Sequence, residues 1–115
     1  MNPMHQPTQI KLVNHGITLE GTDVEITRFL EYIESEWLGV WQTLYNFTDV
    51  KYDLGHDVLY FTTNSGETSL IKAIIKLSTK FPNIFMMYDY YVDDENDDED
   101  GVFYLTQGQL TTGPV

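Results

Sequence analysis

The 115-residue chain contains no cysteine, so it can form neither a disulfide nor a thiolate metal site, as is usual in a reducing cytoplasm. Positive charge is also scarce, because 6 Lys and Arg stand against 18 Asp and Glu, for a formal net charge of -12. This charge opposes attraction to nucleic acid or to an anionic membrane surface. No apolar run approaches the length of a membrane span, and the first seven residues lack the apolar segment of a signal peptide. We therefore expect a cytoplasmic protein without direct nucleic-acid or membrane binding.

Candidate catalytic and metal-binding groups are few. The three histidines are His5, His15 and His56, and none has the spacing to another His or Glu that a zinc site requires. His56 and Asp57 are a candidate acid–base pair, although such residues in turns mostly serve the turn itself. No phosphate-binding loop, dinucleotide motif or serine nucleophile motif occurs. We predict no catalytic residues and no cofactor, with a Tyr, His and Asp site as the enzymatic alternative.

Apolar and aromatic residues are abundant enough for a hydrophobic core. They make up 42% and 14% of the chain, which argues against global disorder. The length fits one domain. We predict a flexible N-terminal tail over residues 1–8, a single α+β domain over residues 9–110 and a C-terminal tail over residues 111–115.

The domain is predicted to begin with a strand and a helix. Residues 10–13 and 17–19 alternate apolar and polar, but the apolar phase changes between them, which predicts a bulge or tight turn at Asn14-His15-Gly16. Thr22 and Glu25 form a capping box for the helix, and Gly39 is predicted to end it. The apolar side chains with helical spacing, which we expect to be buried, are Ile26, Phe29, Leu30, Ile33 and Trp37.

Two strands and a second helix are predicted next. Residues 44–54 indicate a strand with one phase slip or two short strands, and residues 58–63 indicate a central strand, apolar on both faces. Asn64 and Glu67 form a second capping box, for a helix over about residues 66–80. The apolar face of this helix should bury Leu70, Ile71, Ile74, Leu77 and Phe81. Its outer stripe carries three lysines four residues apart, which is typical of a solvent-exposed face: Lys72, Lys76 and Lys80.

The last third of the domain predicts a long β-hairpin with an acidic tip. Two aromatic, β-prone runs, residues 83–92 and 101–109, flank the tip, and Asp89 is the one charged residue of the first run. The tip, residues 93–100, holds seven carboxylates among eight residues. Because like charges repel, we expect the tip to be solvated and mobile.

The predicted order of elements is β-α-β-β-α-β-β. Two helices on one face of an antiparallel sheet cover its apolar side economically, and the arrangement is ferredoxin-like. The strand end Phe61-Thr62-Thr63, the helix end Lys80-Phe81-Pro82 and the strand at residues 85–88 resemble the YubB-like ferredoxin domain of phage and plasmid proteins. The match covers roughly residues 58–104, and Asn64 stands where that family has a tryptophan. The resemblance implies this fold and a mobile-element origin, and it supplies no catalytic residues.

The acidic tip contains a partial calcium-loop pattern. Asn96, Asp98 and Asp100 occupy the first, third and fifth positions of such a loop, and Gly101 occupies the sixth. The twelfth position is Gln107 rather than the bidentate Glu that tight calcium loops use. We therefore predict no tight metal site, and these residues are at most ligands for weak cation association. The alternative is a solvated loop that keeps the hairpin soluble.

The hairpin is aromatic on both faces. Met86, Tyr88, Tyr90 and Val92 should point one way along the strand, and residues 85, 87, 89 and 91 the other way. One face should pack under the helices, and the other should leave an aromatic surface for a partner or a second copy, in a homodimer. The predicted partner-binding residues are Asp93, Asp94, Glu95, Asp97, Asp98, Glu99, Asp100, Tyr88, Tyr90, Tyr91 and Tyr104.

These features favour a protein that acts by binding another protein. Rows of carboxylates imitate a phosphate backbone and can occupy the basic groove of a nucleic-acid-binding protein. Together with the resemblance, this gives the hypothesis of a DNA-mimic inhibitor of a host nuclease complex, in an anti-CRISPR or anti-restriction role in the host cytoplasm. The alternative is a weak divalent-cation-binding or structural accessory domain.

Overall fold

The computed structural model describes residues 12–37, 39–40, 43, 46–63, 70–92 and 100–111. Strand β1 (Val13–Glu20) leads into helix α1 (Asp23–Tyr32), which continues as a π-helical turn, η1 (Ile33–Trp37). Strands β2 (Phe47–Asp53) and β3 (Val58–Thr63) precede helix α3 (Ile71–Lys80). The chain then forms β4 (Phe85–Val92), β5 (Asp100–Thr106) and β6 (Gln109–Thr111).

These elements form an α+β fold around one open, six-stranded antiparallel sheet. Its strand order is β2-β3-β1-β4-β5-β6, so β1 lies between β3 and β4 near the middle. This six-strand order is not the ferredoxin-like order. Strand β6 is not predicted from the sequence, because three residues are too few to show an alternating pattern. It ends at Thr111, one residue beyond the predicted end of the domain at residue 110.

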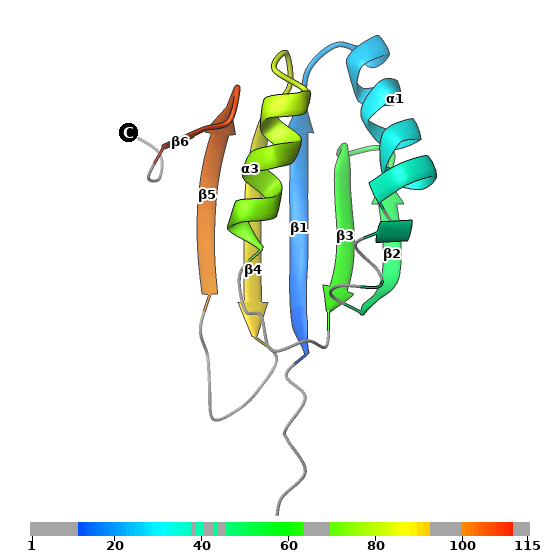
Figure 1. Cartoon of the computed structure of the whole chain (residues 1–115), viewed down its shortest axis with the longest axis vertical. Helices are drawn as coiled ribbons and strands as arrows, with labels where there is room; N and C mark the ends of the chain where they lie inside the picture. The colour runs from blue at the N-terminus through cyan, green and yellow to red at the C-terminus, as the bar shows by residue number, and fades with distance from the viewer. Residues whose placement is uncertain are drawn as a thin grey trace, which may run out of the picture.

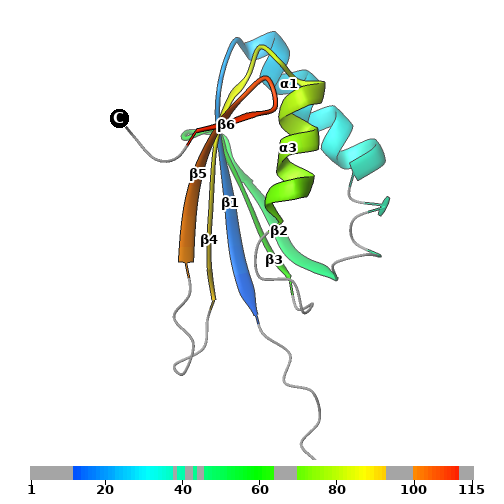
Figure 2. The same cartoon turned by 60° about the vertical axis from the view of Figure 1, so that its left-hand side comes forward.

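Both helices cover the same face of the sheet (Figures 1 and 2). The core lies between the helices and this face, and it joins apolar residues of α1, η1 and α3 to those of all strands from β1 to β5. The predicted packing of two helices on one face is therefore confirmed. The predicted core residues of the helices that are buried include Phe29, Trp37, Leu70, Ile74 and Leu77.

Strand β1 contains neither the bulge nor the turn that the sequence predicts. Its register is continuous against both β3 and β4 from Val13 to Thr18. Val13, His15 and Ile17 are all buried, so the core phase runs through His15 without a change. The prediction fails because it treats histidine as a polar turn residue, whereas His15 occupies a core position.

Helix α1 begins where the sequence predicts. The Thr22 hydroxyl accepts a hydrogen bond from the backbone N–H of Glu25 at 3.2 Å, which is an N-cap interaction. The predicted helix end at Gly39 lies two residues after Trp37, the last residue of η1; Gly39 itself is helical, and residue 38 lies outside the described residues. No helix within the described ranges is long and apolar enough to span a membrane.

Strands β2 and β3 confirm two predictions. The β2–β3 register shifts between Thr48 and Lys51, which is the predicted phase slip. Asp49, within this irregularity, has a positive φ of 51°. Strand β3 pairs with β2 on one side and β1 on the other, as predicted for a central strand.

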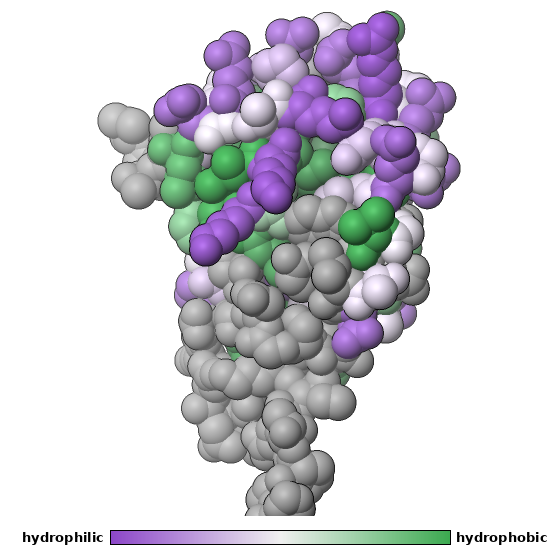
Figure 3. Space-filling view, in the orientation of Figure 1, coloured by the Kyte–Doolittle hydropathy of each residue, from purple (hydrophilic) through white to green (hydrophobic). Residues whose placement is uncertain are grey.

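Helix α3 is described from Ile71, so the predicted capping pair Asn64 and Glu67 lies outside the described residues. Its outward stripe is hydrophilic and exposed, and it carries the three predicted lysines, Lys72, Lys76 and Lys80. The outer surfaces of the helices are largely hydrophilic in the space-filling view (Figure 3). The Lys80 ammonium lies 4.7 Å from the centre of the Tyr32 ring of α1, a cation–π contact between the two helices.

The predicted hairpin is present as β4 and β5. These strands pair antiparallel from Phe85–Thr106 to Tyr91–Asp100. Asp100 is the first residue of β5 rather than the last residue of the tip. The rest of the predicted tip, residues 93–99, lies outside the described residues.

A tight turn joins β5 to β6 and is fastened to α3. Gln107 and Gly108 have φ values of 54° and 76°, the conformation of a type I′ hairpin turn. The Gly108 N–H donates to the buried Ser78 hydroxyl at 2.9 Å. A Cβ atom on Gly108 would overlap the Thr79 hydroxyl. Both the backbone conformation and the close approach to α3 therefore require glycine.

We expect Gly108→Ala to lower the free energy of unfolding by about 1–3 kcal/mol, because alanine is strained at this φ and displaces α3. Gly39→Ala is the matched control, since Gly39 is helical and a Cβ there meets nothing within 4 Å. It should be neutral or stabilising by up to about 1 kcal/mol. Urea denaturation measures both changes, and equal effects of the two substitutions would contradict this account of the turn.

Candidate functional site

The face of the sheet that the helices leave uncovered carries side chains from β1 to β5. We call it the open face. Residues on it alternate with core residues along each strand, and no described helix covers it (Figure 2). The strand register places these residues next to one another across the sheet. They include Asn14, Gly16, Lys51, Tyr60, Thr62, Met87, Asp89, Tyr91 and Tyr104.

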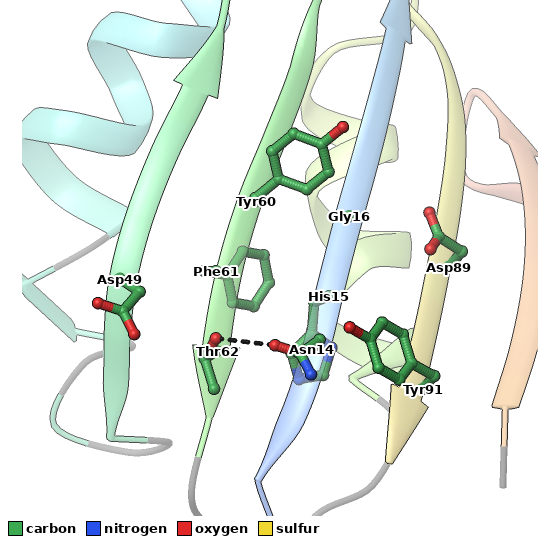
Figure 4. A pocket seen from close by; sticks show the side chains of 9 residues that line it. All are labelled: Asn14, His15, Gly16, Asp49, Tyr60, Phe61, Thr62, Asp89 and Tyr91. Carbon is green, nitrogen blue, oxygen red and sulfur yellow. Dashed lines mark hydrogen bonds between the residues drawn. The ribbon is translucent and has the colours of Figure 1, made fainter. Parts of the chain in front are cut away.

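A hollow lies on the open face above Gly16, and we call it the Gly16 hollow. Gly16 is opposite Tyr60 on β3 and opposite Asp89 on β4. Since glycine has no side chain, the middle of this row is vacant while both neighbours project (Figure 4). The hollow has a volume of about 200 Å³, and its lining includes Asn14, Gly16, Tyr60, Thr62, Asp89 and Tyr91.

Asp89 forms one charged wall of the Gly16 hollow. A Cβ atom on Gly16 would lie 3.0 Å from Asp89 Oδ1, so the carboxylate rests directly against the glycine backbone. Burial raises the pKa of Asp89. Among the described residues, none forms a hydrogen bond or an ion pair with its carboxylate. A half-buried carboxylate without a partner has a strong preference for an incoming cation or hydrogen-bond donor.

Tyrosine rings, an amide and the Asp49 carboxylate also line the hollow. Tyr60 and Tyr91 are 47% and 53% exposed, respectively. Between β3 and β1, the Thr62 hydroxyl donates to Asn14 Oδ1 at 3.2 Å (Figure 4). This bond uses one of the two lone pairs of the Asn14 oxygen, which leaves the other for a ligand. The hollow therefore combines aromatic surface with carboxylate and amide oxygens as acceptors.

The structure separates the tyrosines predicted to bind a partner. Tyr88 and Tyr90 are buried, at 0% and 8% exposed, and they pack in the core rather than on the open face. They lie on the core side of β4 because alternation along the strand turns them toward the helices, and their predicted role in partner binding stays a prediction. Tyr91 is on the open face, and Tyr104 joins it there, opposite Met87. The alternation of the two faces of the hairpin strand is itself confirmed.

Only one of the predicted acidic partner residues lies among the described residues. Asp100 is exposed, and it lies opposite Tyr91, which lines the Gly16 hollow. The others lie outside the described residues: Asp93, Asp94, Glu95, Asp97, Asp98 and Glu99. Of the weak metal candidates, Asn96 and Asp98 are outside as well. Within the described part of the chain, no three metal-ligating side chains converge.

No family model matches the chain, and no curated protein or solved structure matches it significantly. The resemblance to YubB-like ferredoxin domains therefore stays a prediction. The function must be argued from the geometry of the site.

His15 lies on the core side of β1, next to Gly16, in a buried hydrogen-bond network. Its Nδ1 is 2.8 Å from the Tyr88 hydroxyl, and its Nε2 is 2.9 Å from Thr63 Oγ1. The Tyr88 hydroxyl also accepts the Leu70 backbone N–H at 3.0 Å. We assign the tautomer in which Tyr88 O–H donates to Nδ1 and Nε2–H donates to Thr63. This network joins β1, β3, β4 and the start of α3.

A second polar cluster lies in the turn between β2 and β3. Tyr52 O–H donates to Asp57 at 2.6 Å, and His56 Nδ1 is 3.0 Å from Asp53. Burial and the hydrogen bond to Asp57 raise the pKa of Tyr52 to about 12, so this hydroxyl keeps its proton at neutral pH. Asp53 also accepts the Gly55 N–H, as aspartate does in turns. The contacts of this cluster stabilise the turn.

The sequence contains one signal for the site. Asp89 is the one charged residue in the first aromatic run of the hairpin, and it is the residue around which the hollow is built. Its partners come from β1 and β3, and only the strand register brings them together. Gly16, Asn14 and Tyr60 therefore escape sequence reasoning.

Proposed function

We propose that this chain is a small acidic cytoplasmic protein that binds a basic protein surface through its open face. The observation that carries the proposal is the half-buried Asp89 carboxylate, which lies between exposed tyrosines without a described cation beside it. Exposed aromatic surface with a charged centre is typical of a protein-binding site. The target we propose is a nucleic-acid-binding defence protein of a host, which the chain inhibits in an anti-CRISPR or anti-restriction role.

The distribution of charge supports a basic partner on this face. Half of the six cations, Lys72, Lys76 and Lys80, lie on α3, on the other side of the sheet. The open face carries Lys51 and, around the Gly16 hollow, the carboxylates of Asp49 and Asp89, and the acidic residues 93–99 are connected directly to β4 and β5. Two copies with a charge of -12 each repel, so the same charge favours a basic partner over a second copy.

We further propose that β1, α1, β2, β3, α3 and β4 correspond to the split β-α-β arrangement of ferredoxin-like domains. In this reading β5 and β6 extend the sheet beside β4, and with them the open face. The extension is relevant to function because it carries Tyr104 and because β5 begins directly after the acidic segment, residues 93–99. A fold of this kind does not by itself specify an activity.

Removal of charge from the acidic segment tests the proposal. A partner captured from a host lysate is purified, and its binding is measured as a function of salt. Four changes, Asp93→Asn, Asp94→Asn, Asp97→Asn and Asp98→Asn, should lower the association rate by roughly tenfold or more at low salt, because long-range charge acts on encounter. The salt dependence should weaken as well, since fewer screening ions are displaced.

The control removes the same number of charges from the other side of the sheet. Glu25→Gln, Glu31→Gln, Glu34→Gln and Glu36→Gln change acidic residues of α1 and η1 and should leave the association rate within about twofold of the parent. We call the protein with the four Asp→Asn changes the four-Asn protein. If it binds and inhibits as well as the parent at every salt concentration, the acidic segment has no part in recognition. A larger effect of the Glu→Gln set would instead assign the interface to the helices.

A further inference from the structure

We propose that the Gly16 hollow is a binding site for one arginine side chain of the protein partner. This inference rests on the proposed function and specifies where on the open face the partner is anchored. The hollow has a glycine floor, two carboxylates in its lining, those of Asp89 and Asp49, and two exposed tyrosine rings at its rim. These are the three elements that recognise a guanidinium group: space, a bidentate acceptor and a flat aromatic surface.

The position of Asp89 suits a guanidinium. Its Oδ1 lies beside the Gly16 backbone, and the absence of a side chain on Gly16 keeps the carboxylate accessible from the hollow. Burial raises the pKa of Asp89, so the ionised carboxylate is poorly solvated before a ligand arrives. A cation that neutralises it therefore gains more than it would at a fully solvated carboxylate.

Arginine fits the hollow better than lysine or a metal ion. Its planar fork can donate two parallel hydrogen bonds to Asp89 and stack on the ring of Tyr60 or Tyr91. Asn14 Oδ1, with one lone pair left, is a further acceptor at the rim. Arginine is also more weakly hydrated than lysine, which favours a half-buried site. A metal ion needs several ligands, and no three such side chains converge within the described ranges.

Lys51, a described cation on the same face, does not occupy the site. Lys51 is opposite Tyr60, on the side of that ring away from Gly16. Among the described residues no ion pair joins Lys51 to Asp89, and Lys51 is exposed. The acceptor in the hollow is thus available to a side chain from outside.

The experiment uses a capped pentapeptide with one central arginine and glycine elsewhere, titrated into the full-length protein by NMR. We expect saturable shifts at the amides around Gly16 and Asp89. A peptide with lysine should bind several-fold more weakly, and one with citrulline, which is neutral, should produce no saturable shift. Asp89→Asn should weaken binding of the arginine peptide roughly tenfold to hundredfold, because it removes a charge-assisted hydrogen-bond pair.

Glu20→Gln is the matched control. Glu20 is exposed and lies on the same face of β1, four residues along the strand from Gly16. Removal of its charge should change the affinity for the arginine peptide less than twofold. Gly16→Val fills the hollow without changing charge and should abolish the shifts. Thermal melting verifies that each variant is folded, and Asp89→Asn alone decides the matter if Gly16→Val does not fold.

The two proposals fail separately. Equal binding of the arginine peptide by the parent and Asp89→Asn, or no saturable shift near Gly16 in the parent, would overturn the arginine site. The proposed function would stand in that case if the four-Asn protein still lost affinity for its captured partner. A third outcome concerns the link between the hollow and the captured partner. If Asp89→Asn loses peptide binding, but Asp89→Asn and the four-Asn protein both bind the partner as the parent does, that link is overturned.

Discussion

Acidification from pH 7 to pH 5 should lower the free energy of unfolding by about 2 kcal/mol through His15 alone, at 1.36 kcal/mol per pKa unit. Burial lowers the pKa of His15 from 6.5 to about 4. The unfolded chain therefore takes up a proton first as the pH falls. The contribution of His15 to stability is constant above about pH 6.5, decreases between 6.5 and 4, and is then constant again. Urea denaturation at half-unit pH intervals measures this slope.

Two variants isolate the effect of His15 from the other charges. Relief of repulsion among the carboxylates stabilises the fold in acid and is common to all the proteins compared. His15→Gln should lose the downward slope between pH 6.5 and pH 5, while His56→Gln, at an exposed turn position, should keep it. The same pH slope in all three proteins would show that His15 does not titrate between its neutral and charged forms in this way.

Tyr88→Phe should lower the free energy of unfolding by about 2–4 kcal/mol, although it removes a single oxygen atom. The change leaves His15 Nδ1 and the Leu70 N–H, both in the core, without the hydroxyl that contacts them. Each buried polar group that loses its partner costs about 1–3 kcal/mol. Chemical denaturation at pH 7 is the measurement.

Tyr60→Phe removes the same atom from an exposed ring on the open face and should change stability by less than about 0.5 kcal/mol. A Tyr88→Phe protein as stable as Tyr60→Phe would contradict the role of the network. It would mean that water or another group replaces the hydroxyl without cost. The comparison also separates a tyrosine hydroxyl that joins strands in the core from one that is exposed on the open face.

Much of the fold could be predicted from the sequence where one pattern dominates locally. The apolar spacing of both helices predicts their buried faces, and the alternation along β4 predicts which residues share a face. The shift near Thr48 was visible as a phase slip in the apolar pattern. These features depend on neighbours within a few residues, which is the range over which hydrophobic periodicity is informative.

The error at His15 has a different origin. A histidine becomes a core residue when both ring nitrogens have partners, and here the partners are Tyr88 and Thr63, which lie far along the chain. The apolar pattern of the β1 sequence therefore changes phase at a point where the strand itself does not. The Gly16 hollow was missed for the same reason, because it depends on the register that places Gly16 between Tyr60 and Asp89.

Transferred cross-saturation NMR on the complex tests most directly whether the open face binds a basic protein, as we propose. The protein is labelled, the captured partner is irradiated, and the signals that lose intensity identify the contact surface. Intensity should be lost around Gly16, Tyr60, Asp89 and Tyr91, on three neighbouring strands. Loss confined to the outward residues of α1 and α3, with the open face unaffected, would contradict the account.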